Sequence, residues 1–181
     1  MRPLLLLAGL IVAFAAVDAI ALDTSAYYNI VVATQQDNAT DVRTFLVQNV
    51  DPNLTDTSGR TALSYAAASN NSEIAQMLLD AGAKPGIRDK DGNGPLYYAA
   101  IAGHVEVLQL LAKAHAAIDI QNRQGITPLM AAADAGQTKA VRALLAAGAD
   151  PRKQDFTGRD AMSWAAGRPA VLSVLREMQH R

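Results

Sequence analysis

The chain has 181 residues, half of them apolar and 18% charged, which is the composition of a globular rather than a disordered protein. Its formal net charge of −1 gives no indication of nucleic acid or an anionic membrane surface as a partner. Cysteine is absent, which excludes disulfides, thiolate metal sites, cysteine nucleophiles and lipid attachment through cysteine.

The first residues predict a secretory signal peptide. A basic residue at position 2 precedes an uncharged apolar run over residues 4–17, and this run of 14 residues is shorter than the roughly 20 that span a bilayer. Small residues precede a cleavage position after Ala21, and a cut after Ala19 is the alternative. We expect residues 1–21 to be removed and the protein to be exported, either periplasmic in a bacterium or secreted. A buried N-terminal helix and an uncleaved anchor are the competing interpretations.

The rest of the chain repeats with a period of 33 residues. Four columns keep this period: a glycine, a leucine that becomes methionine in the last copy, an alanine pair, and a second leucine present in three copies. Self-similarity at a fixed period is the signature of stacked repeats. The columns are Gly59, Gly92, Gly125, Gly158; Leu63, Leu96, Leu129, Met162; Ala66-Ala67, Ala99-Ala100, Ala132-Ala133, Ala165-Ala166; and Leu78, Leu111, Leu144.

Each copy reads as a turn followed by two short helices. Asp-x-x-Gly opens three of the copies, and Asn122 takes the place of the aspartate in the other. Asp or Asn can hydrogen-bond within its own turn, and Gly supplies a positive φ. Thr127-Pro128 is typical of a helix start, with a capping hydroxyl and a proline in the first helical position. Gly136 ends the first helix of that unit, and Gly148 suits the left-handed position after the second.

The stretch from Asp89 to Leu108, with Gly92, Pro95-Leu96, Ala99-Ala100 and Gly103-His104, resembles the ankyrin repeat. Taken with the predicted signal peptide, the chain is similar to exported bacterial members of that family. The resemblance implies an all-α fold, an ankyrin-repeat solenoid of about five helix-turn-helix units joined by β-hairpin-like turns. The domain would cover residues 22–181, in units at 23–55, 56–88, 89–121, 122–154 and 155–181.

Unit three departs from the pattern at two positions. Gly94 replaces the capping threonine, and His115 stands where a helix-ending glycine belongs. Each change is expected to destabilise its helix end by about 1 kcal/mol. We predict that unit three opens more easily than unit four; neutral drift without functional meaning is the alternative interpretation of the two residues.

The sequence does not favour an enzyme. His104 is expected to be structural, His115 is a turn substitution and His180 lies at the C-terminus, and none has the spacing of a metal ligand. Phosphate-binding glycine loops and serine-hydrolase motifs are also missing from the sequence. We therefore expect no catalytic residues, no metal and no cofactor.

An aromatic column invites two interpretations. Tyr65, Tyr98 and Trp164 share one position of the repeat. They could form a stripe that recognises a ligand, or they could pack one helix against the next.

The resemblance implies that a partner binds the turn tips, called fingers, and the first helices, called the palm. Side chains beside the turn glycines are not needed for the fold and can vary. Over the positions beside the turn glycines and just before each unit, leaving out the turn aspartates, cations outnumber acids by four. Ile126 and Phe156 are expected to be exposed apolar anchors there. The predicted finger residues are Arg60, Arg88, Lys90, Asn93, Arg123, Ile126, Phe156 and Arg159. The predicted palm residues are Gln35, Ser69, Ile101, Asp134 and Arg168.

These observations predict a non-enzymatic protein-binding module that forms a stoichiometric complex with a partner in the cell envelope. The partner surface is expected to be acidic, and the protein itself is expected to be a monomer that binds neither nucleic acid nor, after signal cleavage, a membrane. A solvated face that only keeps the protein soluble is the alternative reading of the finger charges. Alternative functions are an inhibitor or self-protection protein for a periplasmic enzyme, and a membrane-tethered scaffold.

Overall fold

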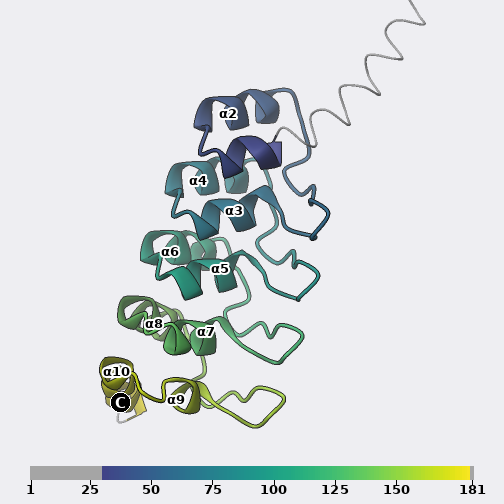
Figure 1. Cartoon of the computed structure of the whole chain (residues 1–181). Coiled ribbons are helices and arrows are strands. Elements are labelled where there is room, and N and C mark those ends of the chain that lie inside the picture. Colours follow the sequence, from purple (N-terminus) through teal and green to yellow (C-terminus); the bar gives the residue numbers. More distant parts are fainter. Residues whose placement is uncertain (1–29, 180–181) are drawn as a thin grey trace, which may run out of the picture.

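The computed structural model describes residues 30–179. The predicted signal peptide at residues 1–21 and the start of unit one lie outside the described residues. Residues 30–35 are helical, and from there to the C-terminus short helices follow one another in antiparallel pairs (Figure 1).

The helices alternate between two rows (Figure 1). The first row contains α3 (Ala62–Ala68), α5 (Pro95–Ala102), α7 (Pro128–Asp134) and α9 (Ala161–Trp164). The second row contains α2 (Ala39–Val47), α4 (Ser72–Asp80), α6 (Val105–Lys113), α8 (Thr138–Ala146) and α10 (Pro169–Gln179).

Each helix packs mainly on its own partner and on the equivalent helices of the neighbouring units. In the first row α3 contacts α5, α5 contacts α7 and α7 contacts α9, while α4, α6, α8 and α10 follow one another in the second row. This one-dimensional contact pattern defines a solenoid. The described residues contain no strand beyond an isolated bridge between Thr55 and Thr61, so the predicted all-α ankyrin solenoid is confirmed.

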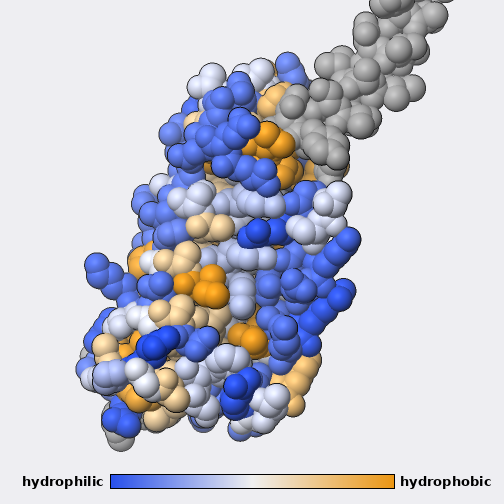
Figure 2. All heavy atoms as spheres, in the orientation of Figure 1, coloured by the Kyte–Doolittle hydropathy of each residue, from blue (hydrophilic) through white to orange (hydrophobic). Residues whose placement is uncertain are grey.

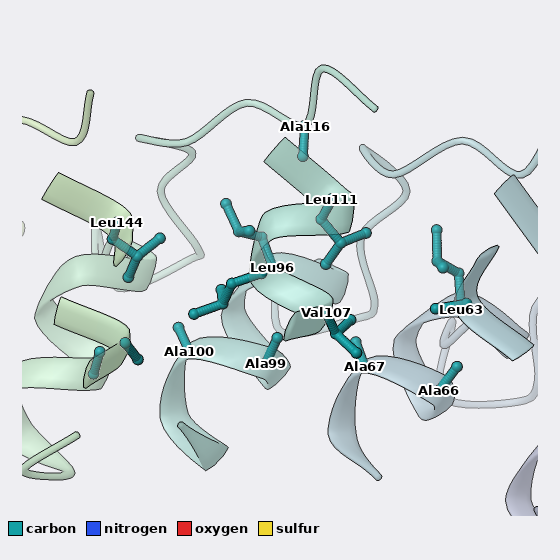
Figure 3. Packing of buried hydrophobic residues seen from close by; sticks show 14 of the residues in the cluster. Leu63, Ala66, Ala67, Leu96, Ala99, Ala100, Val107, Leu111, Ala116 and Leu144 are labelled. Atoms are coloured by element: carbon teal, nitrogen blue, oxygen red, sulfur yellow. The ribbon is translucent and has the colours of Figure 1, made fainter. Parts of the chain in front are cut away.

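The recurring leucine and alanine columns of the repeat form a large part of the core. Leu63, Leu96 and Leu129 are buried in the first row, and Leu78, Leu111 and Leu144 are buried in the second. The alanine pairs lie between them, where small side chains let neighbouring helix backbones come close (Figure 3). The last unit deviates, because Met162 is only half-buried and Ala166 is exposed at the end of the stack.

Capping side chains determine where the first-row helices begin. Thr61 Oγ1 accepts a hydrogen bond from the Ser64 amide at 3.2 Å, and Thr127 Oγ1 accepts one from the Met130 amide at 3.3 Å. Gly94 precedes α5 and provides no such bond. The side-chain cap is therefore missing at the start of α5, which is the basis for the predicted weakness of this unit.

The ends of the second-row helices follow the sequence expectation as well. Gly82 and Gly148 have φ angles of 89° and 95° after α4 and α8. His115 takes the same place after α6 with a φ of 59°, a left-handed backbone that a side chain disfavours. Unit three thus combines an uncapped start with a strained end.

Between the helix pairs the chain projects outward in loops, the fingers, which form a continuous rim (Figure 1). Each fingertip amide donates to a carbonyl of the preceding fingertip: Lys90 to Ser58 at 2.9 Å, Arg123 to Asp91 at 3.0 Å, and Phe156 to Gln124 at 3.2 Å. The rim is therefore held by one backbone hydrogen bond per repeat.

The turn glycines make this contact possible. Gly125 has a φ of 81°, and a Cβ there would lie 2.6 Å from the Phe156 nitrogen of the next finger. Gly92 is similar, because a Cβ would lie 2.9 Å from the Arg123 nitrogen. Glycine is required at these positions both for the turn conformation and for the close approach of the next backbone.

Candidate functional site

The aromatic column ties the fingers to the first-row helices. Tyr65 Oη donates to Asp56 Oδ2 at 2.6 Å, and Tyr98 Oη makes the same bond to Asp89. In the last unit Trp164 Nε1 donates to Asp155 Oδ2 at 3.0 Å. These bonds give the column a structural role within the fold and favour the packing interpretation over a recognition stripe.

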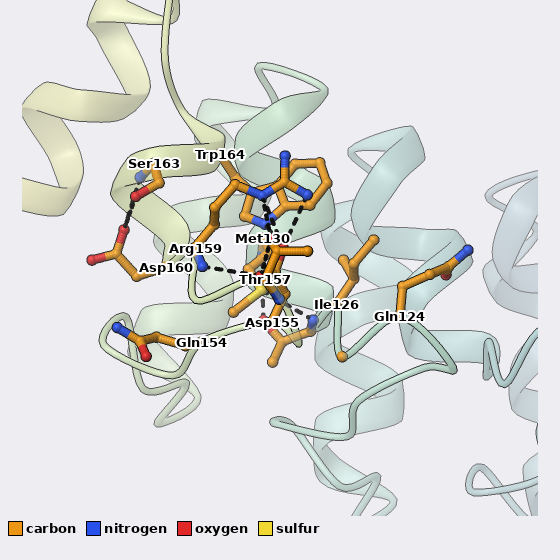
Figure 4. A network of polar contacts seen from close by, with 12 residues as sticks. Gln124, Ile126, Met130, Gln154, Asp155, Thr157, Arg159, Asp160, Ser163 and Trp164 are labelled. Carbon is orange, nitrogen blue, oxygen red and sulfur yellow. Dashed lines mark hydrogen bonds and ion pairs between the residues drawn. The ribbon is translucent and has the colours of Figure 1, made fainter.

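Two of the predicted finger arginines lie on this aromatic column. The guanidinium of Arg60 is inserted between two rings, 4.6 Å from the centre of Tyr65 and 3.8 Å from that of Tyr98. Arg159 lies 4.0 Å over Trp164 and pairs with Asp155 at 3.0 Å (Figure 4). Both cations are held by intramolecular contacts and are less available to a partner than the sequence suggested.

The same network lowers the pKa of two turn carboxyls, those of Asp56 and Asp155. Burial raises the pKa of Asp56, but hydrogen bonds from Ser58, Tyr65 and the Arg60 amide outweigh it and bring the pKa to about 2. The pKa of Asp155 is also lowered, because hydrogen bonds from Thr157 and the Arg159 amide, with the Arg159 charge, exceed the effect of burial. Both carboxylates therefore stay ionised at neutral pH.

The position just after the turn glycine belongs to the fold in the two middle units as well. Asn93 Oδ1 accepts a hydrogen bond from Asn122 Nδ2 at 3.0 Å. Ile126 is half-buried and packs against the core. The expectation that Ile126 is an exposed anchor is therefore wrong. We call this repeat position the helix-facing column: Arg60, Asn93, Ile126 and Arg159.

The remaining finger residues are open to solvent. Arg88, Lys90 and Arg123, here called the rim cations, are exposed, and Phe156 is the most exposed aromatic of the described residues at 72%. Among the described residues no ion pair involves any of the three rim cations. Hydrophilic atoms dominate the finger side of the molecule (Figure 2).

An open hollow of about 450 Å³, here called the tip hollow, lies between the third, fourth and fifth fingers. It brings together three of the predicted finger residues, Arg88, Arg123 and Phe156, from three successive fingers. Its other members were not among the predicted finger residues, and they include side chains that hold neighbouring fingers together. The lining consists of Arg88, Asp89, Gly92, Gln121, Asn122, Arg123 and Phe156.

Gln121 fixes the floor of the tip hollow. Its Nε2 donates to the carbonyl oxygens of Gly125 at 2.7 Å and Gln154 at 2.8 Å, which belong to two successive fingers. Arg88 Nη1 donates to the Gln121 carbonyl at 3.3 Å. The position before each turn, which recurs every 33 residues at 88, 121 and 154, could have indicated this ladder.

The predicted palm residues are all exposed, including Ile101 at 42%. Ser69 Oγ donates to the Tyr65 carbonyl at 3.0 Å, and Arg168 Nε donates to the Asp134 carbonyl at 2.9 Å. Gln35 lies on the helical segment of unit one. The palm residues are spread over every unit and are not gathered into one cluster by these bonds.

Tyr97, on the first-row helix α5, is a half-buried aromatic residue that was not predicted from the sequence to matter. Its ring lies edge-on to that of Tyr98 with centroids 5.8 Å apart. Burial raises its pKa, and the nearby carboxylates of Asp134, Asp89 and Asp91 add to the effect. The signal was weak, because equivalent positions in the neighbouring units are Ser64 and Met130.

One of the three histidines considered as a metal ligand, His104, has a partner within the fold. His104 Nδ1 donates to the Ala67 carbonyl at 3.1 Å, which gives this histidine a structural partner in the preceding unit. Within residues 30–179, acidic and histidine side chains form no cluster of three or more that could hold a metal ion.

Across the same residues, no helix combines the length and apolar character needed to cross a membrane.

Comparison with known families agrees with this geometry. A family model described as ankyrin repeats in three copies matches residues 30–122 and again residues 114–180. No curated protein matches the chain. Ankyrin repeats are generally protein-interaction modules and are generally not enzymes. Since the two matches together cover most of its length, the chain belongs to the ankyrin-repeat family.

Proposed function

We propose that this protein acts by stoichiometric binding of an acidic partner protein in the cell envelope, through the open side of its fingers. It would bind as a monomer, without turnover. The observation that carries the proposal is the set of rim cations, which lie on successive fingers without an acidic partner among the described residues.

The exposed side chains of the rim differ in charge from the chain as a whole. The whole chain has a net charge of −1, yet Arg88, Lys90 and Arg123 project from one rim. An acidic surface that approaches this rim would be steered by it and would neutralise charges that the fold leaves unpaired. Phe156, beside the cations, adds the exposed aromatic area that is common at interface hot spots.

The envelope location rests on the sequence of residues 1–21 alone. A basic start, a short apolar run and small residues before Ala21 support cleavage by a signal peptidase. N-terminal sequencing of the protein purified from its native host would test this part. A first residue of Leu22, or of Ile20 for the alternative cut, supports export, and an intact residue 1–21 segment supports the membrane-tethered scaffold.

Charge reversal tests the binding surface. The triple variant R88E/K90E/R123E should lose the proteins that the unaltered chain retains from the exported fraction. A matched triple variant, K113E/K139E/R176E, changes the same charge at exposed residues of the second-row helices and should retain them. Equal retention by both variants contradicts the proposal. The retained protein, once purified, should form a complex of fixed stoichiometry in analytical ultracentrifugation.

Inhibition is the second candidate function. If the partner is an enzyme of the envelope, mixing it with this protein at equal concentration should reduce its activity, and the first triple variant should not. A scaffold would leave the activity unchanged.

A further inference from the structure

We infer that the tip hollow is a subsite for an acidic side chain of an extended partner segment, with a neighbouring apolar side chain of that segment placed on Phe156. This inference rests on the proposed function and identifies the part of the rim that selects the partner. It commits to a peptide segment and excludes a free carboxylate or a flat acidic surface as the specific ligand.

The charge in the hollow favours an anion. Arg88 and Arg123 line it, and both are exposed. The carboxylate of Asp89, its one acidic member, already accepts hydrogen bonds from the amides of Asp91 and Asn93, both at 2.9 Å, and from the Tyr98 hydroxyl. Its oxygens are therefore engaged within its own repeat, and no ion pair within residues 30–179 joins it to either arginine.

The fourth unit contributes a neutral turn residue to the tip hollow, where the corresponding residue of the other units is negatively charged. Its turn begins with Asn122, whereas the second, third and fifth units have an aspartate at that position. Asn122 Oδ1 still accepts the turn amides of Gln124 at 2.9 Å and Ile126 at 3.0 Å. The turn is thus preserved with a neutral side chain in the unit that lines the hollow, which leaves its arginine charges less compensated.

Phe156 is held in a defined position at the edge of the hollow. Its amide donates to the Gln124 carbonyl at 3.2 Å, and its ring lies so close to Gly125 that a Cβ there would be 2.7 Å from Cδ1. The ring is nevertheless 72% exposed. An aromatic that is both exposed and fixed can contact an apolar side chain without a large loss of conformational entropy on binding.

The dimensions agree with a side-chain subsite. About 450 Å³ of open space is enough for a carboxylate side chain and part of its neighbours, and the Gln121 hydrogen bonds keep the lining fingers in register. Arginine can bind a carboxylate through two parallel hydrogen bonds. Two arginines next to one fixed aromatic ring therefore match a segment in which an acidic residue is adjacent to a leucine or an aromatic residue.

Three nine-residue peptides test the inference by titration into the ¹⁵N-labelled protein. They share Gly-Ser flanks and carry Glu-Glu-Leu, Gln-Gln-Leu or Glu-Glu-Ser at the centre. The first should shift the Nε–H signals of Arg88 and Arg123 and the backbone amide of Phe156. Its affinity should exceed that of the Gln-Gln-Leu peptide by about tenfold and that of the Glu-Glu-Ser peptide by a smaller factor.

Variants locate the binding. R88Q/R123Q should remove the preference for glutamate, and F156S should remove the preference for leucine while the preference for glutamate remains. K84Q/K139Q, which removes the same charge from exposed positions outside the hollow, should leave both preferences unchanged. Amide spectra of each variant establish that the fold is retained.

Equal affinities for the three peptides overturn the inference, as does a Glu-Glu-Leu affinity no higher than that of sodium acetate. These outcomes are distinct from failure of the proposed function. If the R88E/K90E/R123E variant loses the retained partner but the peptides do not discriminate, the rim binds the partner without this subsite. If that variant keeps the partner, the proposed function itself fails.

Discussion

The guanidinium of Arg60 lies 3.8 Å from the ring centre of Tyr98, a residue of the next repeat, while its other side faces Tyr65 of its own repeat at 4.6 Å. A side chain predicted to contact a partner thus joins two units of the solenoid. Its Nε is buried without a hydrogen-bond acceptor among the described residues. Stacking on the two rings is therefore its principal contribution.

The first prediction concerns this stack. R60A should reduce the free energy of unfolding by about 1–2 kcal/mol, since both cation–π contacts and the packing of the side chain are lost. R60M retains most of the aliphatic volume and should recover part of the loss. Urea denaturation measures both variants. If R60M is as stable as the unaltered protein, the charge contributes nothing and the stacking argument fails.

The second prediction separates backbone strain from contact between fingers. Gly125 and Gly158 have nearly equal φ angles of 81° and 83°, but only Gly125 has the next finger against it. Both alanine variants should lose about 1 kcal/mol from the left-handed backbone. G125A should lose a further 1–3 kcal/mol, roughly, through overpacking against the Phe156 backbone.

Thermal or urea unfolding of G125A and G158A gives the difference directly, and the Gly158 variant serves as the internal control. Equal destabilisation would mean that the fingers separate without a free-energy cost. The rim would then be less rigid than its backbone hydrogen bonds indicate.

The third prediction is a loss of stability in acid. The folded pKa of Asp56 is about 2, below the ordinary value of 3.8, so folding favours the ionised carboxylate. The stabilisation is complete above pH 4 and is lost as the pH falls from about 4 towards 2. The lowered pKa of Asp155 acts in the same direction.

Urea midpoints measured between pH 6 and pH 2.5 should fall steeply below pH 4, and D56N/D155N should flatten that dependence while it lowers stability at pH 6. The natural Asn122 shows that the turn tolerates the amide. A D56N/D155N profile as steep as that of the unaltered protein would assign the acid sensitivity to other carboxyls.

The fourth prediction concerns unit three. H115G should stabilise the protein by about 1 kcal/mol, because glycine adopts the φ of 59° without strain. In the unaltered protein, the amides of α5 and α6 should exchange with solvent faster than those of α7 and α8. The reason is that the unit of α7 and α8 has both the Thr127 cap and Gly148. Equal protection of the two units, measured by hydrogen exchange, would refute the difference.

Much of the fold could be predicted because the same local sequence signals recur from repeat to repeat. The turn glycines, the Thr127 cap and the buried leucines occur where the structure needs positive φ, a helix start and a core. The last helix could be predicted as well, since the apolar residues Val171, Leu172, Val174 and Leu175 recur at helical spacing after Gly167 and lie in α10.

The candidate site was harder to predict because it depends on which side of a finger each residue faces. From the sequence alone, Arg60 and Arg88 are both expected to be exposed cations. In the structure Arg60 stacks on an aromatic ring, whereas Arg88 is exposed. The spacing contained a usable signal. Arginine occurs five residues before an aromatic residue in both Arg60–Tyr65 and Arg159–Trp164, which could have marked these arginines as structural.

A second signal lies in the turn aspartates. The three units with Asp at the turn have Tyr or Trp nine residues later, and the unit with Asn122 has Ala131. In the unit with Ala131, no phenol or indole is available to donate to a second carboxylate oxygen of the turn residue. Asn122 has an amide nitrogen in place of that oxygen, and this nitrogen donates to Asn93. The pairing of a turn aspartate with an aromatic residue nine positions later therefore marks finger residues that have a structural role, as opposed to those whose side chains are free to contact a partner.

The hydrogen bond from each fingertip to the one before it occurs once every 33 residues. A duplicated unit inserted at that interval would meet the same donor on one side and the same acceptor on the other. The length of the binding edge can therefore change by tandem duplication of coding sequence, while the chemistry that joins one copy to the next stays constant. Because the joining hydrogen bonds involve only backbone groups, a change in the number of repeats and a change in the exposed side chains can occur independently.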